Sequence, residues 1–325
     1  MQRSCYPYGM DHKGTIGVDA HRGSGDQAVE ERDPATMQIW MNGKLVPRSE
    51  ATVSVYDHGL LYGDGCFEGI RAYGGRVLKL KSHLARMYES ASLIRLAPAF
   101  DVDEIEDAVR QTLVANDLTD AYIRLIFTRG VGTLGLHPFR CPTPGTIVIA
   151  DKISLYPQEL YDQGMDIILA KRPRIPIPCL DPRIKSLNYL NNILAKIEAI
   201  DAGVLEAIML NTDGMVAECT GDNIFMVKDG RLITPDASTG ILHGVTRRFV
   251  MNEIAPACGY QVEEAHFPIE TLLDADEIFL TGTAAEVIGV TKIDDRQIGD
   301  GRVGPVTNAC IAEFRRRIAE DCPED

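Results

Sequence analysis

The segment Arg183–Asn192, RIKSLNYLNN, places a lysine directly ahead of a helical pattern. Lys185 follows the proline-rich stretch PRIPIPCLDP and precedes the run NYLNNILAKIEAIDAG. A lysine in this position is either an ordinary solvated charge or an amine held in place for nucleophilic or acid–base chemistry. The other polar motifs of the chain decide between these two interpretations.

Four further features would suit a bound anion with an acid nearby. Leu242–Arg248 (LHGVTRR) contains a glycine-led turn that enters a helix, where free N–H groups and the helix dipole favour an anion. Leu280–Val287 (LTGTAAEV) combines threonine hydroxyls with small residues at a strand end. Arg86 lies within a predicted helix, and Glu218 lies at a strand end beside small residues. Taken singly, these features also fit a plain helix start, a tight turn and solvated charges.

One familiar motif is misleading in this chain. Gly130, Gly132 and Gly135 form a GxGxxG pattern after a predicted strand, but a dinucleotide site needs a helix that begins at the third glycine. The sequence continues LHPFRCPTPG, whose prolines are incompatible with that helix, so the pattern predicts a loop. The sequence also lacks GxxxxGK[ST], HExxH and GxSxG, so a P-loop, a metal site or a hydrolase elbow is not expected.

The overall composition is typical of a globular protein with an acidic balance. The 325 residues are 45% hydrophobic and 25% charged, and the net charge is −14. Without a basic stripe, nucleic acid is not an expected partner, although a locally positive pocket can still bind an anionic small molecule. The apolar runs are far shorter than the ~20 residues of a membrane helix, so no membrane partner is expected. Eight cysteines without a CxxC pair fit free thiols in the cytoplasm.

The length of the chain favours two domains. Residues 1–36 contain no apolar signal sequence and are expected to be a poorly ordered extension, with Met37 as an alternative first residue. Residues 37–152 are predicted to form a small α+β domain. The regular pattern lapses at 153–163, where we place the linker, and residues 164–325 are predicted to form a larger domain.

Local patterns predict the elements of both domains. The first is expected to contain a hairpin at Asn42–Gly43, a helix with Ser82 as its N-cap, a second helix with an acidic first turn, and the strands AYIRLIFTRG and PGTIVIAD. The second is expected to contain a strand, the helix after Lys185, a strand meander, a helix that ends at Gly259, two more strands and a C-terminal helix. Strands that arrive in runs predict an α+β class with mixed or antiparallel sheets.

From about Met37 onward, the ordered motifs resemble those of fold-type IV pyridoxal-phosphate aminotransferases, and most of all the branched-chain amino-acid aminotransferases. The motifs that carry this resemblance are YGDGCFEGIRAY, HLARM, AYIR, IKSLNYLNNILAKIEA, ECTGDNIF, LHGVTR and TGTAAEV. The resemblance implies a two-domain, D-amino-acid aminotransferase-like α+β fold with pyridoxal 5'-phosphate in the interdomain cleft. It also implies a homodimer or higher homo-oligomer in which loops from a neighbour close the site.

The resemblance also implies how a cofactor would be held. Lys185 matches the lysine that forms a Schiff base with the cofactor and later moves a proton as a general acid and base. Tyr189 matches the tyrosine bonded to the phenolate oxygen, although the Lys-to-Tyr spacing varies by one residue among relatives. Glu218 matches the acid that keeps the pyridine nitrogen protonated. The groups matched to the phosphate are Arg86, the amides of Val245 and Thr246, and the Thr283 hydroxyl.

A substrate pocket is implied in the same way. The matched residues are Tyr62, Phe67, Gly69, Arg71, Tyr122, Arg124, Thr283 and Ala284. Tyr122 and Arg124 match a pair that helps to hold substrate carboxylates, and the turn at Thr283–Ala284 matches the site of the α-carboxylate. An apolar wall with a rim arginine can accept a Leu, Ile or Val side chain and can also pair with the distal carboxylate of glutamate. His243 stands where many relatives have proline, and the variable loop TLGLHPFRC leaves the side-chain preference open.

The implied reaction is a ping-pong transamination. A branched-chain L-amino acid gives its amine to the cofactor, and 2-oxoglutarate then accepts the amine and becomes glutamate. The alternatives are a D-selective or relaxed transaminase and an aminodeoxychorismate lyase-like enzyme, which shares the lysine and phosphate grip but not the FEGIRAY wall. A non-catalytic cofactor-binding protein would not need Lys185 and Glu218 together, and a nucleotide-dependent oxidoreductase would need the rejected GxGxxG site.

Overall fold

The computed structural model describes residues 36–152, 156–320 and 322–325, which belong to one compact unit, Arg32–Asp325. The predicted extension at 1–36 lies outside the described residues apart from Thr36. No helix within the described ranges is long and apolar enough to cross a membrane.

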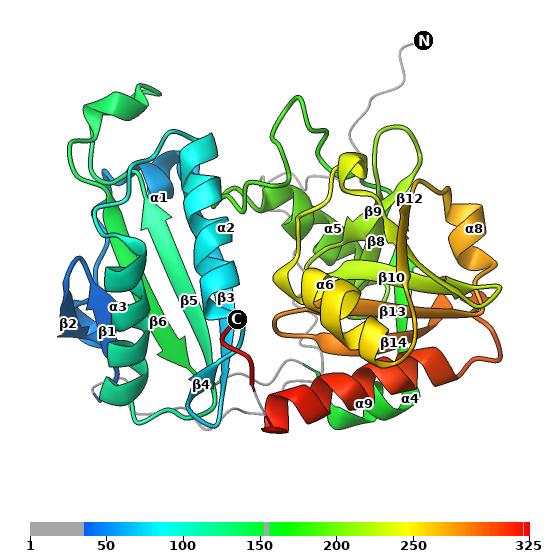
Figure 1. Ribbon diagram of the computed structural model, residues 1–325. Coiled ribbons are helices and arrows are strands. Elements are labelled where there is room, and N and C mark those ends of the chain that lie inside the picture. The colour runs from blue at the N-terminus through cyan, green and yellow to red at the C-terminus, as the bar shows by residue number, and fades with distance from the viewer. Residues whose placement is uncertain (1–35, 153–155, 321) are drawn as a thin grey trace, which may run out of the picture. The chain divides into compact units, whose positions relative to one another are not determined.

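The first sheet is formed by strands from the first half of the chain (Figure 1). The described strands have the order β2-β1-β6-β5-β3-β4, and all neighbours are antiparallel. The strands are β1 (Gln38–Met41), β2 (Lys44–Pro47), β3 (Gly65–Tyr73), β4 (Arg76–Val77), β5 (Ala121–Thr128) and β6 (Gly145–Asp151). The predicted hairpin is confirmed, because Asn42 and Gly43 both adopt positive φ in the two-residue turn between β1 and β2.

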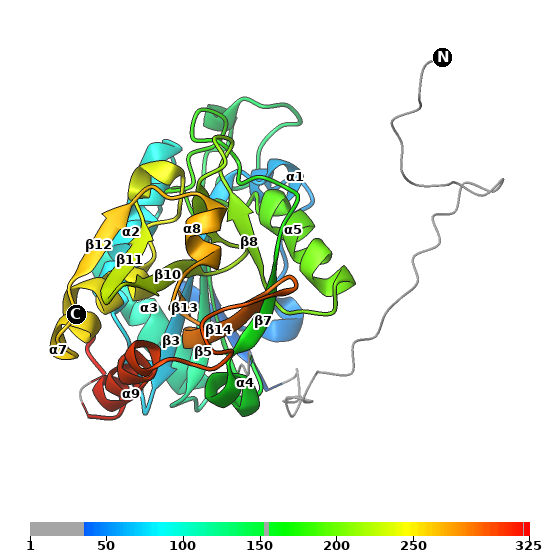
Figure 2. The ribbon, with the colours of Figure 1, turned by 90° about the vertical axis from the view of Figure 1, so that its right-hand side faces the viewer.

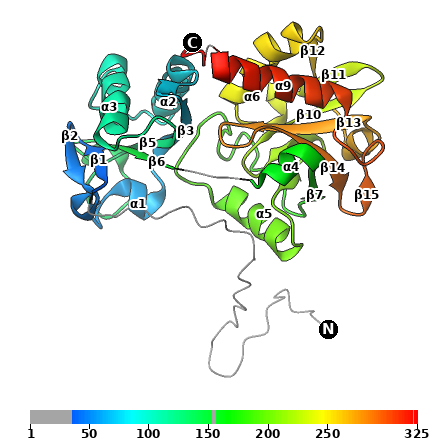
Figure 3. The same ribbon diagram turned by 90° about the horizontal axis from the view of Figure 1, so that it is seen from below.

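Two long helices cover one face of this sheet. The helices of this half are α1 (His58–Tyr62), α2 (Leu80–Leu93) and α3 (Val102–Ala115), with 3-10 turns at Arg48–Glu50 and Pro138–Arg140. Figure 3 shows α2 and α3 on the same side of the strands, where their apolar faces bury a shared core against β3, β5 and β6. Helix α3 begins with a capping box formed by Asp101 and Glu104, in line with its predicted acidic first turn. No α-helix begins at Gly135, so the prediction of a loop there is confirmed.

Helix α2 begins earlier than its sequence pattern predicts. It starts at Leu80 with Lys79 in the N-cap position, so the prediction of Ser82 as the cap is wrong. The N–H and hydroxyl of Ser82 both donate to the Asp325 carboxylate, at 3.0 and 2.7 Å. A carboxylate remote in sequence therefore satisfies a free N–H in the first turn of α2, and no local pattern could reveal this contact.

The second sheet is mixed, one of the two arrangements that the predicted class allows (Figure 2). Within the described residues its order is β12-β11-β10-β13-β14-β7-β8-β9, and β15 pairs with β14. The β11–β12, β14–β7 and β7–β8 pairs are parallel. The strands are β7 (Met165–Leu169), β8 (Ala207–Leu210), β9 (Val216–Cys219), β10 (Asn223–Lys228), β11 (Arg231–Pro235), β12 (Val262–Ala265), β13 (Glu277–Gly282), β14 (Glu286–Ile293) and β15 (Arg296–Gln297).

The helices of this half pack around the second sheet. They are α4 (Gln158–Gln163), α5 (Leu190–Asp201), α6 (Val245–Phe249), α7 (Ala255–Ala257), α8 (Ile269–Leu273) and α9 (Pro305–Glu320), with a 3-10 turn at Ala237–Thr239. Helix α4 falls inside the predicted linker, whose residues 153–155 lie outside the described part of the chain. The division into two domains at this linker stays a prediction.

A π-helical turn at Val250–Ile254 joins α6 to α7. The N–H of Ala255 bonds to the Val250 carbonyl, five residues back. Since Pro256 has no N–H and its ring would crowd a regular α-helical turn, the wider turn lets the helix continue past it. The chain then leaves the helix at Gly259, where φ is 85°, as predicted.

A buried ionic cluster connects β3 to α2. The Glu68 carboxylate accepts hydrogen bonds from Arg86 Nε at 2.7 Å and Nη2 at 2.8 Å, and His83 Nδ1 lies 2.8 Å from it. Arg86 Nη1 also donates to the His243 carbonyl at 3.0 Å. Burial alone would raise the pKa of Glu68, but Arg86 and His83 outweigh it and hold that pKa well below its ordinary value. Burial lowers the pKa of His83, which favours the neutral imidazole.

We predict that Glu68→Gln lowers the free energy of unfolding at pH 7 by about 3–5 kcal/mol, because it leaves the Arg86 guanidinium buried without its counter-charge. The depressed pKa means that this stabilisation is complete above pH 4.5, the ordinary pKa of glutamate, and is lost as the pH falls through the folded-state value. Urea unfolding of both proteins at pH 7 and pH 4 measures the difference. If the difference in unfolding free energy between the parent protein and Glu68→Gln stayed the same as the pH was lowered, the depressed pKa of Glu68 would be contradicted.

Candidate active site

Lys185 is held by backbone pairing to an open stretch of the β3 edge. Strand β4 pairs only with Ala72 and Tyr73, so the Gly65–Phe67 end of β3 is free on that side. The lysine segment fills this edge: Phe67 N–H donates to the Lys185 carbonyl at 2.9 Å, and Leu187 N–H donates to the Gly65 carbonyl at 3.0 Å. These bonds place the lysine between the two sheets, immediately before α5.

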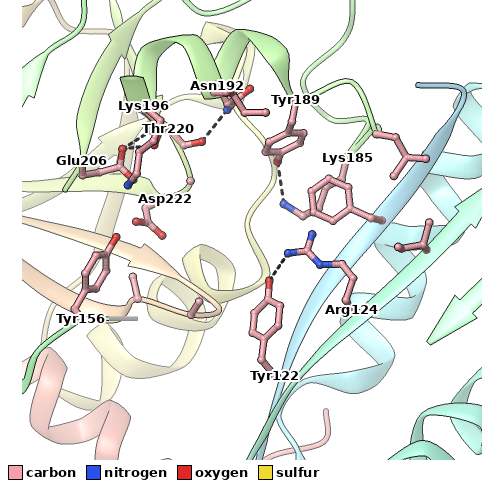
Figure 4. Close-up of a pocket in the computed structure, with 17 residues that line it drawn as sticks. Tyr122, Arg124, Tyr156, Lys185, Tyr189, Asn192, Lys196, Glu206, Thr220 and Asp222 are labelled. Carbon is pink, nitrogen blue, oxygen red and sulfur yellow. Dashed lines mark hydrogen bonds and ion pairs between the residues drawn. The ribbon is translucent and has the colours of Figure 1, made fainter. Parts of the chain in front are cut away.

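A cavity of about 550 Å³ opens beside this segment (Figure 4). Its volume lies within the range of small-molecule sites. Its walls come from β3, β5, the lysine segment, α5, the turn between β9 and β10, and the turn after β13. The lining residues are Phe67, Tyr122, Arg124, Ile126, Tyr156, Lys185, Leu187, Tyr189, Asn192, Ile193, Lys196, Glu206, Thr220, Gly221, Asp222, Ala284 and Ala285.

The Lys185 amine projects into this cavity against aromatic rings. Its Nζ donates to the Tyr189 hydroxyl at 3.0 Å and lies 4.7 Å from the centre of the Phe67 ring. The Arg124 guanidinium lies 4.5 Å from the same ring. Phe67 therefore contacts both cations through its π-system, which attracts positive charge.

The adjoining wall depends on a glycine. Arg124 Nη2 donates to the Tyr122 hydroxyl at 3.2 Å, and both side chains line the cavity. A Cβ on Gly69, which pairs with Arg124 across the sheet, would lie 2.0 Å from that hydroxyl. The tyrosine can lie across β3 only because Gly69 has no side chain.

A second, smaller cavity is lined by several of the residues that the family resemblance assigns to the cofactor phosphate. Val245 and Thr246 at the start of α6 line it together with Thr283, Arg71 and His83. Arg71 Nε is buried and has no hydrogen-bond partner among the described residues. The free N–H groups that begin a helix and this unpartnered guanidinium N–H form a donor set suited to an anion. Arg71 therefore lies by the matched phosphate residues, whereas it was predicted in the substrate wall.

The turn after β13 separates the two spaces. Thr283 lines the smaller one, and Ala284 lines the larger one. Glu218, on β9, is buried just outside the cavity lining and accepts from Arg174 Nε at 2.8 Å and from the Leu242 N–H at 2.9 Å. The two donors engage both oxygens of the Glu218 carboxylate.

Two of the predicted site residues, Arg86 and Tyr62, line neither cavity of the single chain. Arg86 is buried in the ionic cluster with Glu68 and reaches toward the start of α6 only through the carbonyl of His243. Tyr62 lines neither cavity, and its hydroxyl accepts from the Gly135 N–H at 2.8 Å.

Sequence reasoning missed one group of polar residues in the cavity wall. Glu206, Thr220 and Asp222 line it together, and Tyr156 lies beside them (Figure 4). The motif ECTGDNIF contains Thr220 and Asp222, but only its glutamate was assigned a role. Nothing in the local pattern around Glu206 or Tyr156 marked them as site residues.

Comparisons with known proteins point to one enzyme family. Residues 65–293 match the family described as amino-transferase class IV. A Methanocaldococcus jannaschii protein assigned to the branched-chain-amino-acid aminotransferases is 47% identical over 279 residues, which cover 86% of this chain and 96% of that protein.

Two solved structures share the fold. The Escherichia coli branched-chain amino acid aminotransferase aligns with a TM-score of 0.84 at 34% identity, covering 86% of this chain and 94% of that one. The T.th. branched-chain amino acid aminotransferase complexed with N-(5'-phosphopyridoxyl)-L-glutamate aligns with a TM-score of 0.82 at 36% identity, covering 89% and 96%.

The predicted fold class is confirmed by these structures and by the two sheets with their covering helices. The class IV match includes most of the first sheet, the lysine segment and most of the second sheet. The chain belongs to the class IV aminotransferase family.

Proposed function

We propose that the protein transfers the amino group of branched-chain L-amino acids to 2-oxoglutarate, giving branched-chain 2-oxo acids and glutamate. The observation that carries the proposal is the Lys185 amine in a cavity whose wall combines the Phe67 ring with the Arg124 guanidinium. The relatives named as branched-chain aminotransferases cover nearly all of the described chain and support the same substrate class.

The residues present fit pyridoxal 5'-phosphate. The larger cavity has the volume of a cofactor and substrate site, with a primary amine and a phenol 3.0 Å apart in its wall. The orphaned Nε of Arg71, the first N–H groups of α6 and the hydroxyl of Thr283 suit its phosphate. Lys185, Tyr189, Glu218, Val245, Thr246 and Thr283 would hold the cofactor, with Arg86 supporting the start of α6 through His243. When bound, this cofactor supplies an electron sink for the reacting carbon.

The chain's own residues would supply proton transfer and orientation. Lys185 Nζ would take the proton from the substrate Cα as a general base and then, as a general acid, deliver it to the cofactor rather than back to that carbon. The Tyr189 hydroxyl accepts a hydrogen bond from that amine at 3.0 Å and would orient it. The arginine and asparagine donors around Glu218 would hold its carboxylate in place for the ring nitrogen of the cofactor.

The cavity wall can serve both halves of the proposed reaction. Phe67, Ile126 and Leu187 offer apolar surface to a branched side chain. Arg124 can pair with the distal carboxylate of glutamate or 2-oxoglutarate. Tyr122, with the turn at Ala284, would face the α-carboxylate.

The visible absorbance of the protein reconstituted with pyridoxal 5'-phosphate should change with the state of the cofactor. L-leucine should abolish the visible absorbance of the lysine-bound cofactor, and 2-oxoglutarate should restore it. D-alanine should leave the absorbance unchanged. A response to D-alanine but not to L-leucine would instead favour the D-selective alternative.

Lys185→Ala should lack the visible absorbance and reduce kcat by about 10²–10⁴-fold or more, because the general acid–base amine is lost. Lys171→Ala is the matched control, since Lys171 is exposed on the preceding segment, and it should retain both properties. Retention of the absorbance by Lys185→Ala would overturn the assignment of the lysine.

The proposal includes a homo-oligomer, supported by an exposed apolar surface near the site. We call this surface the α1–loop face: it comprises Leu60, Tyr62, Val131, Leu134 and Leu136, whose exposed fractions range from 38% to 80%. The loop is tied to α1 by the Tyr62–Gly135 bond and by His58, whose Nε2 lies 2.8 Å from the Thr133 carbonyl. Contiguous apolar surface of this kind is typical of a subunit interface. Tyr62 would then act toward the site of a neighbouring copy.

We predict that the double variant Leu134→Lys/Leu136→Lys converts the oligomer to a single chain of 35.7 kDa and raises KM. Light scattering coupled to size exclusion measures the mass. Val114→Lys is the control, because Val114 on α3 is as exposed as Leu136, at 80%, but lies outside the α1–loop face. A double variant that keeps the mass of the parent protein would refute this interface.

A cytoplasmic location is part of the same proposal. All seven cysteines within the described residues are free thiols, the form that reducing compartments maintain.

A further inference from the structure

The cavity contains an acidic side chain to which the proposed reaction assigns no role. Asp222 lies in the turn between β9 and β10, where its carbonyl accepts from the Cys219 N–H at 2.8 Å. Its side chain lines the cavity, although the residue is only 9% exposed. Figure 4 shows the carboxylate beside Tyr156 and Thr220, across the opening from Lys185 and Arg124.

The Asp222 carboxylate makes no hydrogen bond or ion pair with any residue that the structure describes, whereas Oε1 of its acidic neighbour Glu206 accepts three hydrogen bonds. Glu206 accepts from the N–H and hydroxyl of Thr220 and from the Ala207 N–H, and Lys196 Nζ lies 3.9 Å from it. Burying a polar group without a hydrogen-bond partner costs folding free energy, so a buried and unpaired side chain in a cavity indicates a group that bonds to a ligand. Of the two acids, only Asp222 can offer its whole hydrogen-bonding capacity to a ligand.

The position of Asp222 is fixed by close packing against the end of β13. A Cβ on Gly282 would lie 1.9 Å from Asp222 Oδ1, so the carboxyl rests directly on that backbone. The same turn continues into Ala284 and Ala285, which also line the cavity. The carboxyl therefore lies next to the segment that the proposed function assigns to the substrate α-carboxylate.

Several titratable groups act on Asp222. Burial comes first and Glu206 second in raising its pKa to about 7, with a smaller contribution from Glu218. Lys196 on α5 and Lys185 oppose this shift. The remaining titratable neighbours are Tyr156, Tyr161 and Cys219, whose own pKa values are raised by burial and, to a lesser degree, by Asp222.

A second carboxylate in this space would act on Asp222 through its charge. Two ionised carboxylates close together repel, and one of them then takes up a proton. A protonated carboxyl has one O–H donor, which can bond to the ligand's carboxylate oxygen. Uncharged ligands would produce no such effect.

We propose that Asp222 is a substrate-binding residue that takes up a proton when a substrate carboxylate enters the cavity and donates that proton in a hydrogen bond to it. This inference rests on the proposed function, because it requires a carboxylate ligand. It makes substrate affinity pH-dependent. Below about pH 7, Asp222 is already protonated, so the affinity for the carboxylate ligand does not change with pH. Above about pH 7, binding of each ligand is coupled to the uptake of one proton from solvent by Asp222. The affinity therefore falls about tenfold per pH unit in that range.

The test is isothermal titration calorimetry on the holoenzyme at pH 8, in two buffers with different ionisation enthalpies. The ligand is 4-methylvalerate, which has a carboxylate and a branched chain but no amine to transfer. We expect uptake of about one proton in the parent protein and none with the uncharged 4-methylvaleramide. Asp222→Asn should abolish the uptake and flatten the dependence of Kd on pH above 7.

Asp213→Asn is the matched control, because Asp213 lies exposed in the turn that follows β8, and it should keep the uptake. Binding of 4-methylvalerate without proton uptake, or uptake that persists in Asp222→Asn, overturns the role of Asp222 and leaves the proposed function standing. If neither 4-methylvalerate nor L-leucine binds, the proposed function fails as well. The comparison of the two ligands in the parent protein tests the proposal even if the variant does not fold.

Discussion

The site depends on one open stretch of a strand edge. Because β4 pairs only with the far end of β3, the Gly65–Phe67 backbone remains available, and the lysine segment completes the sheet there. Backbone pairing fixes position more tightly than side-chain contacts on a loop could. The position of the Lys185 amine thus follows from the register of β3, although Lys185 is separated from that strand by more than a hundred residues.

The same strand organises the rest of the site through its alternating faces. Phe67 and Gly69 face the cavity side, while Glu68 points the other way and anchors Arg86 of α2 inside the core. Arg86 in turn holds the His243 carbonyl just ahead of α6. The buried cluster of Glu68, His83 and Arg86 therefore links β3, which contributes to the wall of the larger cavity, to the start of α6, which lines the smaller cavity. Such a link requires good geometry throughout, because a buried charge that loses its partner is strongly destabilising.

Much of the fold could be predicted where local chemistry decides the structure. The Asn42–Gly43 turn, the acidic first turn of α3 and the end of α7 at Gly259 each depend on residues close in sequence. The start of α2 was predicted incorrectly because the Ser82 N–H in its first turn bonds to Asp325, and β14 was not predicted at all. In the site, the motifs indicated Lys185, Phe67 and Tyr189, and the structure places all three in the lining of one cavity. They could not show that Arg71 lines the smaller space, since which space a strand residue faces is decided by packing between distant segments.

The polar residues of the cavity form an uneven electrostatic wall, and this explains how one space could receive two unlike substrates. On one side, Phe67 and Tyr122 lie against the Arg124 guanidinium, so apolar surface and positive charge occupy the same wall. A branched side chain can pack on the rings, and a second carboxylate can reach the guanidinium, without any rearrangement of the chain. On the other side, an acid of near-neutral pKa opposes further negative charge unless it is protonated. The choice between substrates would then depend on pH as well as on shape, because the Arg124 wall attracts negative charge and the Asp222 wall repels it.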